Sequence, residues 1–191
     1  PQLDHMGGLN YLIERFRIGE VWTNGVPRET DFFKRFQHLV AAKGLTVRHP
    51  KRGLEPAITA DCKILTLNPS DREIADKLNN SSIVLRIFCD DISFLYTGDI
   101  EGEAERDLIN SGDIFQGDII KVPHHGSRGS LDNDFITKVH PKVAVISVGR
   151  YNPYGHPKEE VIEAYKDLGA EVLRTDFDGA ISIRKTEGAF I

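Results

Sequence analysis

The stretch that decides the fold is Lys121-Val-Pro-His-His-Gly-Ser-Arg-Gly-Ser130. An apolar run over residues 118–122 predicts a short strand, and Pro123 ends it because proline has no backbone N–H to donate to a sheet. His124 and His125 then enter a loop of small residues that leaves the backbone open. A strand end that delivers two imidazoles into such a loop can hold a metal or a phosphate, and a solvated surface loop is an equal alternative for this stretch alone.

Three further motifs place candidate ligands where a strand ends or a helix begins. Leu3-Asp4-His5-Met6-Gly7-Gly8 opens the chain, Tyr96-Thr-Gly-Asp99 lies upstream of the histidine loop, and Tyr154-Gly-His-Pro157 lies downstream. Taken singly, Asp99 could cap a turn or a helix, and His156 could be an ordinary loop residue. Carboxylates and imidazoles without thiolates suit Zn, Mn or Fe, and numerous carboxylates favour Mn. Together the motifs predict a catalytic metal site, in which Asp99 could bridge two metals about 3.5–4 Å apart.

Between these motifs, strand patterns alternate with helix patterns. The hairpin of 82–89 and 92–97 around the turn at 90–91 is the clearest signal. Strands that alternate with helices predict mixed sheets with the helices packed outside. The expected strands are 20–23, 46–49, 61–67, 82–89, 92–97, 118–122, 142–147, 171–174 and 180–184; the expected helices are 7–16, 29–43, 71–78, 101–109, 132–139 and 158–168.

The length of 191 residues predicts one domain, or one domain and a small appendage, and the 40% apolar and 28% charged residues are typical of a soluble globular protein. No apolar run approaches the roughly 20 residues that span a bilayer. The net charge of −5 argues against a broadly basic nucleic-acid surface, but not against a nuclease whose metal supplies positive charge locally. Cys62 and Cys89 lack metal-type spacing and sit in apolar runs, which favours buried free thiols, with a disulfide as the lesser alternative.

On these motifs the chain resembles the metallo-β-lactamase-fold domain of the ComEC competence proteins, the DNA-uptake channel family, and its stand-alone relatives. The resemblance covers nearly the whole chain and implies one domain over residues 1–191, an α/β four-layer αββα sandwich of mixed sheets. The residues that carry it are Asp4-His5-Met6-Gly7-Gly8, Ser82-Ile-Val-Leu, Leu95-Tyr-Thr-Gly-Asp99, Lys121-Val-Pro-His-His-Gly-Ser127, Asn152-Pro-Tyr-Gly-His-Pro157 and Arg174-Thr-Asp176.

The chain departs from the family pattern at two places. The family's opening motif has a His five residues before the position of His5 and a carboxylate two residues before Asp4, where this chain has Gln2. The middle metal His of metallo-β-lactamases is also absent, and Asn79-Asn80-Ser81-Ser82 stands in that region. We therefore expect the chain to begin inside its first motif, to lack the strands that precede it, and to have an empty or half-filled metal site.

The resemblance implies a metal-dependent deoxyribonuclease, with Mn the expected metal and Zn or Mg the alternatives, that degrades the strand of incoming DNA that is not transported. One of the two adjacent histidines would bind metal or protonate the leaving oxygen, and the other would contact the scissile phosphate. Lys121 and Arg150 would add a local basic rim. The implied metal ligands are Asp4, His5, Asp99, His125 and His156; the implied catalytic residues are Asp4, Asp99, His124 and His125; the implied DNA-binding residues are Ser127, Arg128, Ser130, Asn152 and Tyr154.

The expected partners are the DNA substrate and a transmembrane channel portion of the same parent chain, with this domain outside the cytoplasm and no stable protein partner. Two alternatives stay open. Another hydrolase of the same fold, acting on a small ester, lactone or phosphodiester, would use the same ligands. The other alternative is a degenerate domain that only binds DNA or organises a channel, and Gln2 at a usual ligand position keeps it open.

Overall fold

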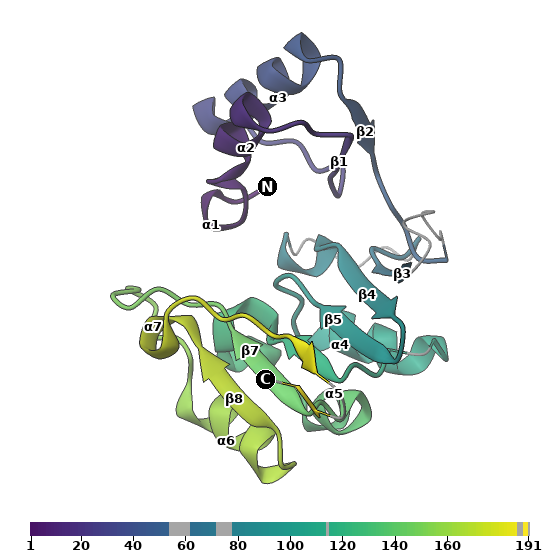
Figure 1. Ribbon diagram of the computed structural model, residues 1–191, viewed down its shortest axis with the longest axis vertical. Helices are drawn as coiled ribbons and strands as arrows, with labels where there is room; N and C mark the ends of the chain where they lie inside the picture. Colours follow the sequence, from purple (N-terminus) through teal and green to yellow (C-terminus); the bar gives the residue numbers. More distant parts are fainter. Residues whose placement is uncertain (54–61, 72–77, 114, 187–188, 191) are drawn as a thin grey trace.

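A six-stranded sheet organises the larger part of the molecule (Figure 1). The computed structural model describes residues 1–53, 62–71, 78–113, 115–186 and 189–190. Strands β3, β4 and β5 are antiparallel neighbours, and β5 to β8 run parallel. In sheet order the strands are β3 (Cys62–Asn68), β4 (Val84–Cys89), β5 (Ile92–Tyr96), β6 (Ile119–Lys121), β7 (Val143–Ile146) and β8 (Glu171–Arg174).

Three helices make the crossovers that parallel strands require. They are α4 (Gly102–Ser111), α5 (Asn133–Val139) and α6 (Glu159–Asp167), and they connect β5 to β6, β6 to β7, and β7 to β8. The carboxyl ends of β5 to β8 therefore meet at one edge of the sheet, and the loops that leave this edge are where ligands bind in such sheets. The Thr97-Gly98-Asp99 turn (the TGD motif) follows β5, and the loop that carries His124 and His125 (the histidine loop) follows β6. Both therefore lie at this edge.

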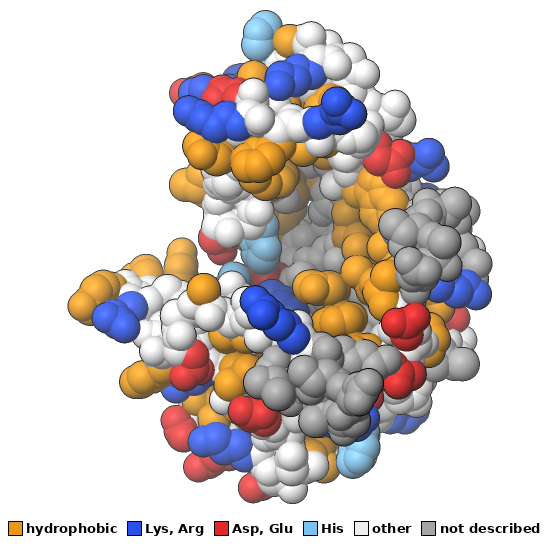
Figure 2. All heavy atoms as spheres, viewed as in Figure 1, with side chains coloured by type: hydrophobic (Ala, Val, Ile, Leu, Met, Phe, Trp, Pro, Cys, Tyr) orange, Lys and Arg blue, Asp and Glu red, His pale blue; other side chains and the backbone are white. Residues whose placement is uncertain are grey.

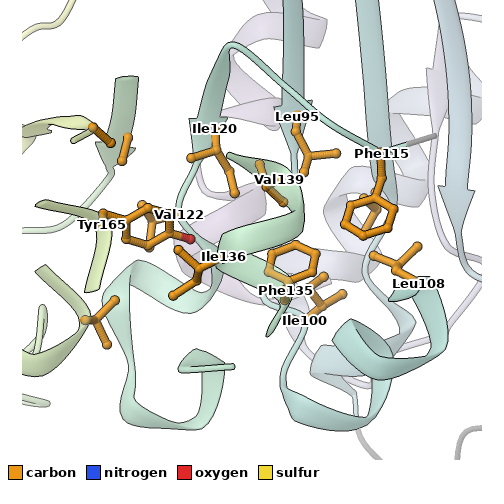
Figure 3. Close-up of a cluster of buried hydrophobic side chains, with 14 of the residues drawn as sticks. Leu95, Ile100, Leu108, Phe115, Ile120, Val122, Phe135, Ile136, Val139 and Tyr165 are labelled. Atoms are coloured by element: carbon orange, nitrogen blue, oxygen red, sulfur yellow. The ribbon is translucent and has the colours of Figure 1, made fainter. Parts of the chain in front are cut away.

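The main core lies between the sheet and these helices (Figure 3). Leu95 and Ile120 from the strands pack with helix residues such as Phe135 and Tyr165, all of them essentially inaccessible to solvent. The rings of Phe115 and Phe135 are stacked with their centroids 5.7 Å apart. Each large side chain buried this way stabilises the fold by about 1.5–3 kcal/mol, so this core fixes the positions of the loops at the sheet edge.

The opposite face of the sheet carries a smaller apolar cluster, built on Ile92, Ile119 and Val143. Ile183, from the expected strand 180–184, packs against it. The expected strand at 180–184 is wrong, because this segment has no strand pairing. Among the described residues, the strands that follow α7 (Thr175–Asp178) are β9 (Lys185–Thr186) and β10 (Ala189–Phe190), which pair with each other. The alternation of residues 181–184 is real, but the segment lies on the face of the sheet and joins no ladder.

The N-terminal residues form a separate small unit with its own apolar core, built on Ile13, Phe33, Phe36 and Val40 (Figure 1). Its strands form a parallel pair. The helix expected at 7–16 is instead two short helices, because Gly7 and Gly8 separate them. The elements are α1 (Leu3–Met6), α2 (Leu9–Arg15), β1 (Glu20–Trp22), α3 (Asp31–Ala42) and β2 (Thr46–Arg48).

The mixed α/β organisation expected from the sequence is confirmed. The other sheets among the described residues are two-stranded: β1 pairs with β2, and β9 pairs with β10. The turn at 79–82 is present as η1 (Asn79–Ser81). The helix expected at 71–78 lies largely outside the described residues. No helix in the described part of the chain is long and apolar enough to cross a bilayer.

The two cysteines form a disulfide, so the expectation of free thiols is wrong. Cys62 of β3 lies directly opposite Cys89 of β4, with the Cα atoms 4.2 Å apart. Antiparallel neighbours that share no hydrogen bonds approach to about 4.5 Å, which is close enough for the two sulfurs to bond. The pairing depends on the register of two strands 27 residues apart, and spacing along the sequence does not reveal that register.

Candidate metal centre

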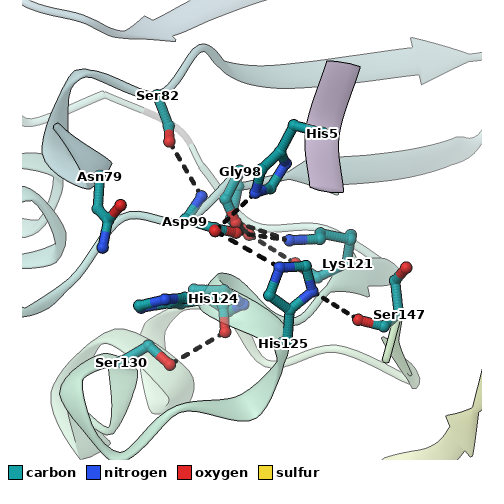
Figure 4. Close-up of polar contacts among 12 residues, drawn as sticks. His5, Asn79, Ser82, Gly98, Asp99, Lys121, His124, His125, Ser130 and Ser147 are labelled. Carbon is teal, nitrogen blue, oxygen red and sulfur yellow. Dashed lines mark hydrogen bonds and ion pairs between the residues drawn. The ribbon is translucent and has the colours of Figure 1, made fainter. Parts of the chain in front are cut away.

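Four candidate ligands converge at the carboxyl edge of the sheet, and Figure 4 shows His5, Asp99 and His125 among them. Asp4 and His5 come from α1, Asp99 follows β5, and His125 follows β6. Each offers one ligand atom, and these atoms all lie within 4.8 Å of one another. An ion with nitrogen and oxygen ligands at about 2.0–2.2 Å holds those ligands within about 4.4 Å of one another, so a small closure suffices to coordinate one.

The turn that carries Asp99 depends on the glycine before it. Gly98 has φ +57°, and a Cβ there would lie 2.5 Å from the Cβ of Ser82. The Asp99 backbone N–H donates to Ser82 Oγ at 3.0 Å. Only glycine allows this left-handed turn and the close approach of Ser82, just before β4, which explains the Gly-Asp order in the motif.

The histidine loop begins as η2 (Pro123–Gly126) with two residues in left-handed conformation, His124 at φ 45° and His125 at φ 54°. This conformation disfavours a residue with a Cβ by roughly 1–2 kcal/mol. Gly126 follows at φ +78°, where a Cβ would lie 2.5 Å from that of Pro157. The loop therefore packs directly on the Tyr154-Gly-His-Pro157 segment, and its unfavourable backbone turns both imidazoles toward the sheet edge.

Asp99 is the buried centre of the group, with its side chain 3% exposed. His5 Nε2 lies 2.7 Å from Oδ2, and Lys121 Nζ lies 3.3 Å from Oδ1. Burial raises the pKa of Asp99, but contacts with His125 and His5 and the charge of Lys121 outweigh it and hold that pKa well below its usual range. The carboxylate is therefore ionised. Lys121 is not part of an exposed rim as expected: it lies beneath the group, where burial lowers its pKa, and also donates to the Gly98 carbonyl at 2.7 Å.

His125 is oriented as a ligand. Its Nδ1–H donates to the Ser147 carbonyl at 2.6 Å, which leaves Nε2 facing the carboxylates. Nε2 lies 3.5 Å from both Asp4 Oδ2 and Asp99 Oδ2 and is buried without a hydrogen-bond partner among the described residues. The contact with Asp99 raises the pKa of His125. The Nε2 lone pair and the two carboxylates repel one another unless a cation lies between them. That cation is either a proton on Nε2 or a metal ion, and the nitrogen and oxygen atoms that face one another here are ligands that fit a metal.

His124 and His156 form a second pair beside this group, with ring centroids 5.8 Å apart. His124 Nδ1 donates to Glu101 Oε1 at 2.7 Å. His156 Nδ1 is buried and has no hydrogen-bond partner within the described ranges, and burial, then the neighbouring His124 and Lys158, lower its pKa. The structure does not bring His156 into the group of four, although the sequence predicted it there.

The expected DNA-binding residues of the histidine loop are largely engaged within the protein. Ser127 Oγ caps η3 (Arg128–Ser130) by accepting from the Gly129 N–H at 3.2 Å. The Ser130 hydroxyl is fully buried and donates to the carbonyls of Pro123 and Ser127, so the structure does not place it at the surface. Arg128 is exposed and forms an ion pair with Glu160 at 2.5 Å. Of these three residues, only Arg128 has an exposed side chain that could reach a DNA phosphate.

Asn152 and Tyr154 lie in the loop after β7. The Asn152 side chain bonds backbone groups of Gly149 and His156, so it shapes the loop. The Tyr154 side chain is 72% exposed. Asn152, Tyr154 and His156 line a cavity of about 380 Å³ that also reaches Asp4 and His125. A cavity of roughly 300–1,000 Å³ is of ligand-binding size, and this one opens directly onto the candidate metal ligands.

Sequence reasoning missed Glu101, Ser82 and Ser147, which orient His124, Asp99 and His125. Glu101 lies two residues after Asp99, and a carboxylate that close to a predicted ligand was the available signal. The carbonyl of Ser147 gave none, since every residue has a carbonyl. Gln2 and Asn79, the positions that depart from the family pattern, face each other, with Nε2 of Gln2 3.5 Å from Oδ1 of Asn79.

Carboxylates and histidines from α1 and from the carboxyl ends of two parallel strands meet around one point, which is the arrangement of a metal centre. A model of the metallo-beta-lactamase superfamily matches residues 3–150, so the chain belongs to that superfamily. The match covers α1, the TGD turn and the histidine loop, which together supply the four converging ligands.

The relatives that the chain matches include a ComE operon protein and a competence protein, and the resemblance to the ComEC family is confirmed. The chain is 34% identical over 182 residues to ComE operon protein 3 of Bacillus subtilis (strain 168), covering 95% of the chain and 23% of that protein. It is 36% identical over 116 residues to competence protein ComA of Neisseria gonorrhoeae, covering 60% and 17%. Recombination protein 2 of Haemophilus influenzae is 32% identical over 105 residues, covering 55% and 13%. The chain thus spans about a quarter or less of the length of these relatives.

Proposed function

We propose that this chain is a metal-dependent nuclease domain that hydrolyses DNA phosphodiester bonds. The observation that carries the proposal is the convergence of Asp4, His5, Asp99 and His125, with His125 Nε2 facing two carboxylates. The similarity to competence proteins supports DNA as the substrate. Two carboxylates and two imidazoles favour Mn, with Zn and Mg as the alternatives.

Asp4, His5, Asp99 and His125 would hold a divalent metal, whose Lewis acidity would serve to polarise a phosphoryl oxygen and activate water. The protein's own part is positioning. Lys121 holds Oδ1 of Asp99 and leaves Oδ2 facing His5 and His125. Glu101 fixes the ring of His124, which lies 6.1 Å from that of His125 and would contact the scissile phosphate. The cavity beside the ligands gives the DNA backbone a way in.

Electrostatics favours a metal-dependent reaction over a metal-free one. The protein has a net charge of −5, and the site contains the ionised Asp99 and the carboxylate of Asp4. Lys121 already neutralises part of the Asp99 charge, and its ammonium is turned inward to the Gly98 carbonyl. A phosphodiester would meet net negative charge at the ligands unless a cation stood between them.

The proposed setting is DNA uptake, with degradation of the strand that is not transported, in a domain outside the cytoplasm. The Cys62–Cys89 disulfide supports this location, because structural disulfides persist in oxidising compartments and are rare in the cytosol. The relatives are several times longer than this chain. We infer a transmembrane channel portion of the same parent chain as the partner that would deliver the DNA.

The test is cleavage of plasmid and circular single-stranded DNA with Mn, Mg or Zn and with EDTA. Asp99→Asn preserves shape and removes the central carboxylate, and we expect activity to fall at least about a hundredfold, beyond the 10- to 100-fold typical of residues that only support a ligand. Asp167→Asn, at the exposed end of α6, is the matched control and should be unchanged. Circular dichroism and Mn²⁺ titration of the Asp99→Asn variant separate lost folding from lost ligation.

Three results would count against the proposal. No cleavage with any of the three metals, together with turnover of a small ester, would favour another hydrolase of the same fold. Cleavage that persists in Asp99→Asn would move the chemistry away from this group of residues. Failure of the intact protein to bind any of the metals would favour the domain that binds DNA without catalysis.

A further inference from the structure

Three aromatic rings stand exposed on the loop after β7 and on α7, the two segments that border the cavity on its side away from α1. Tyr151 is 90% exposed, and Tyr154 and Phe177 are each 72% exposed. The tyrosines lie in the loop after β7, and Phe177 lies in α7, which follows β8. In Figure 1 this loop projects beside α7, and in Figure 2 the projection on the left carries hydrophobic and basic side chains together. Single exposed rings are common, but three on two segments that border one cavity need an explanation.

The rings are held out on an ordered loop. The Asn152 amide donates to the carbonyls of Gly149 at 2.9 Å and His156 at 2.8 Å, and its oxygen accepts from the His156 N–H at 2.9 Å. Arg150 Nε donates to the Asp176 carbonyl at 3.2 Å, which ties the loop to α7. Rigid presentation of aromatic rings to water lowers the entropy lost when they bind a ligand.

One of the three rings, that of Tyr154, belongs to the cavity that begins at the candidate ligands. Tyr154 lines it together with Asp4, His125 and Thr175. Its ring is stacked on that of His156, with centroids 5.9 Å apart and planes 16° apart. A chain molecule whose backbone reached His125 would therefore extend outward past Tyr154, toward the linked segments that carry Tyr151 and Phe177.

Cationic groups are interleaved with these rings. The Arg174 guanidinium lies 4.4 Å from the Phe177 ring centroid and is also paired with Asp176. Arg150 is exposed beside Tyr151, and Lys158 Nζ donates to the Tyr154 carbonyl at 3.2 Å. Aromatic faces alternating with cations bind single-stranded nucleic acid, because bases stack on the rings and phosphates approach the cations.

We propose that Tyr151, Tyr154 and Phe177 are a stacking platform for unpaired bases, which selects single-stranded over duplex nucleic acid at this cavity. A duplex keeps its base faces stacked inside the helix and cannot offer them to these rings. The inference rests on the proposed function for its link to cleavage, but base stacking can be measured without any cleavage.

The test is fluorescence anisotropy with labelled oligo-dT in EDTA at low ionic strength, where no metal-dependent cleavage occurs. Tyr151→Ala should weaken binding about 5- to 150-fold, the range for loss of one stacked base, and Tyr151→Trp should retain it. An abasic oligonucleotide of equal length and a duplex should bind alike to wild type and Tyr151→Ala. Tyr11→Ala is the matched control, since Tyr11 is also exposed and has Arg15 4.2 Å from its ring centroid, but lies in α2.

The outcomes separate this inference from the nuclease proposal. If DNA is not cleaved but Tyr151→Ala still weakens oligo-dT binding selectively, the stacking platform stands and the nuclease proposal fails. Equal effects on oligo-dT and abasic DNA, or no binding of oligo-dT by wild type, would overturn the platform even if cleavage is observed. Tyr151-dependent binding to anionic phospholipid vesicles, with oligo-dT binding unaffected by the substitution, would assign the rings to a membrane surface and also overturn it.

Discussion

Glu105 of α4 gives the sharpest stability prediction, because it is a carboxyl group enclosed in the main core. Its side chain is fully buried, and neither oxygen has a hydrogen-bond partner among the described residues. Burial, followed by the charges of Asp132 and Glu101, raises its pKa from 4.5 to about 9, with Arg106 opposing. Glu105 also raises the pKa of the buried Tyr165 hydroxyl, after the larger effect of burial itself. The folded protein therefore holds a neutral Glu105 at neutral pH.

The magnitude follows from proton linkage. Between pH 4.5 and about 9 the folded state keeps a proton on Glu105 that the unfolded chain has released. As far as Glu105 is concerned, the free energy of unfolding is thus highest below pH 4.5. It falls by about 1.4 kcal/mol for each pH unit above that, and it levels off above the pKa that Glu105 has in the folded state. From about pH 5 to about pH 7.5 the loss is roughly 3 kcal/mol, a large fraction of the 5–15 kcal/mol that holds a typical domain folded.

Glu105→Gln keeps the shape and removes the ionisation, so its free energy of unfolding minus that of wild type should increase by about 3 kcal/mol between about pH 5 and about pH 7.5. Urea unfolding followed by fluorescence of Trp22, the single tryptophan, and by circular dichroism measures it. Glu103→Gln, exposed on the same helix, is the matched control and should run parallel to wild type. A Glu105→Gln difference that is constant across this pH range would refute the reasoning.

Two further outcomes are expected. The contact with Asp99 raises the pKa of His125 above 6.5, and a metal must displace the proton that His125 Nε2 binds below this pKa. The apparent affinity for Mn²⁺ should therefore fall about tenfold for each pH unit below the pKa of His125. Calorimetry from about pH 6 to about pH 8 measures this, and a pH-independent affinity would contradict it. Replacing both Cys62 and Cys89 by serine should lower the free energy of unfolding by about 3–4 kcal/mol, as expected for a loop closed over a separation of 27 residues. A reductant should lower the free energy of unfolding of the wild type by a similar amount and leave that of the double variant unchanged. If the reductant destabilises both proteins equally, the disulfide is not the cause.

Much of the fold was predictable because its signals are local. The hairpin of β4 and β5, the amphipathic helix α3 and the strand before the histidines are set by residue type over a few positions, and their ends lie within a few residues of expectation. The exceptions have identifiable causes. Gly7 and Gly8 divide one expected helix, and the segment after α7 has a strand-like alternation without a neighbouring strand to pair with among the described residues.

The candidate site was predictable as a set of ligands but not as a geometry. Carboxylates and histidines where a strand ends or a helix begins indicated Asp4, His5, Asp99 and His125 from the sequence. Asp99 and His125 meet because parallel strands bring their carboxyl ends to one edge. Spacing could not tell that His156 lies beside His124, outside the group of four. That separation depends on how two loops pack, through contacts such as that of Gly126 with Pro157.

The sequence by itself determined which chemical groups are available and roughly where the chain turns, because residue type sets local conformation and ligand chemistry. Tertiary structure decided what each group touches: Lys121 beneath Asp99 instead of on a rim, Ser130 inside the loop, and Cys62 opposite Cys89. These contacts join residues distant in sequence and follow from strand register and loop packing. The physical reason is that pKa, accessibility and coordination depend on neighbours in space, and the sequence specifies those neighbours only through the completed fold.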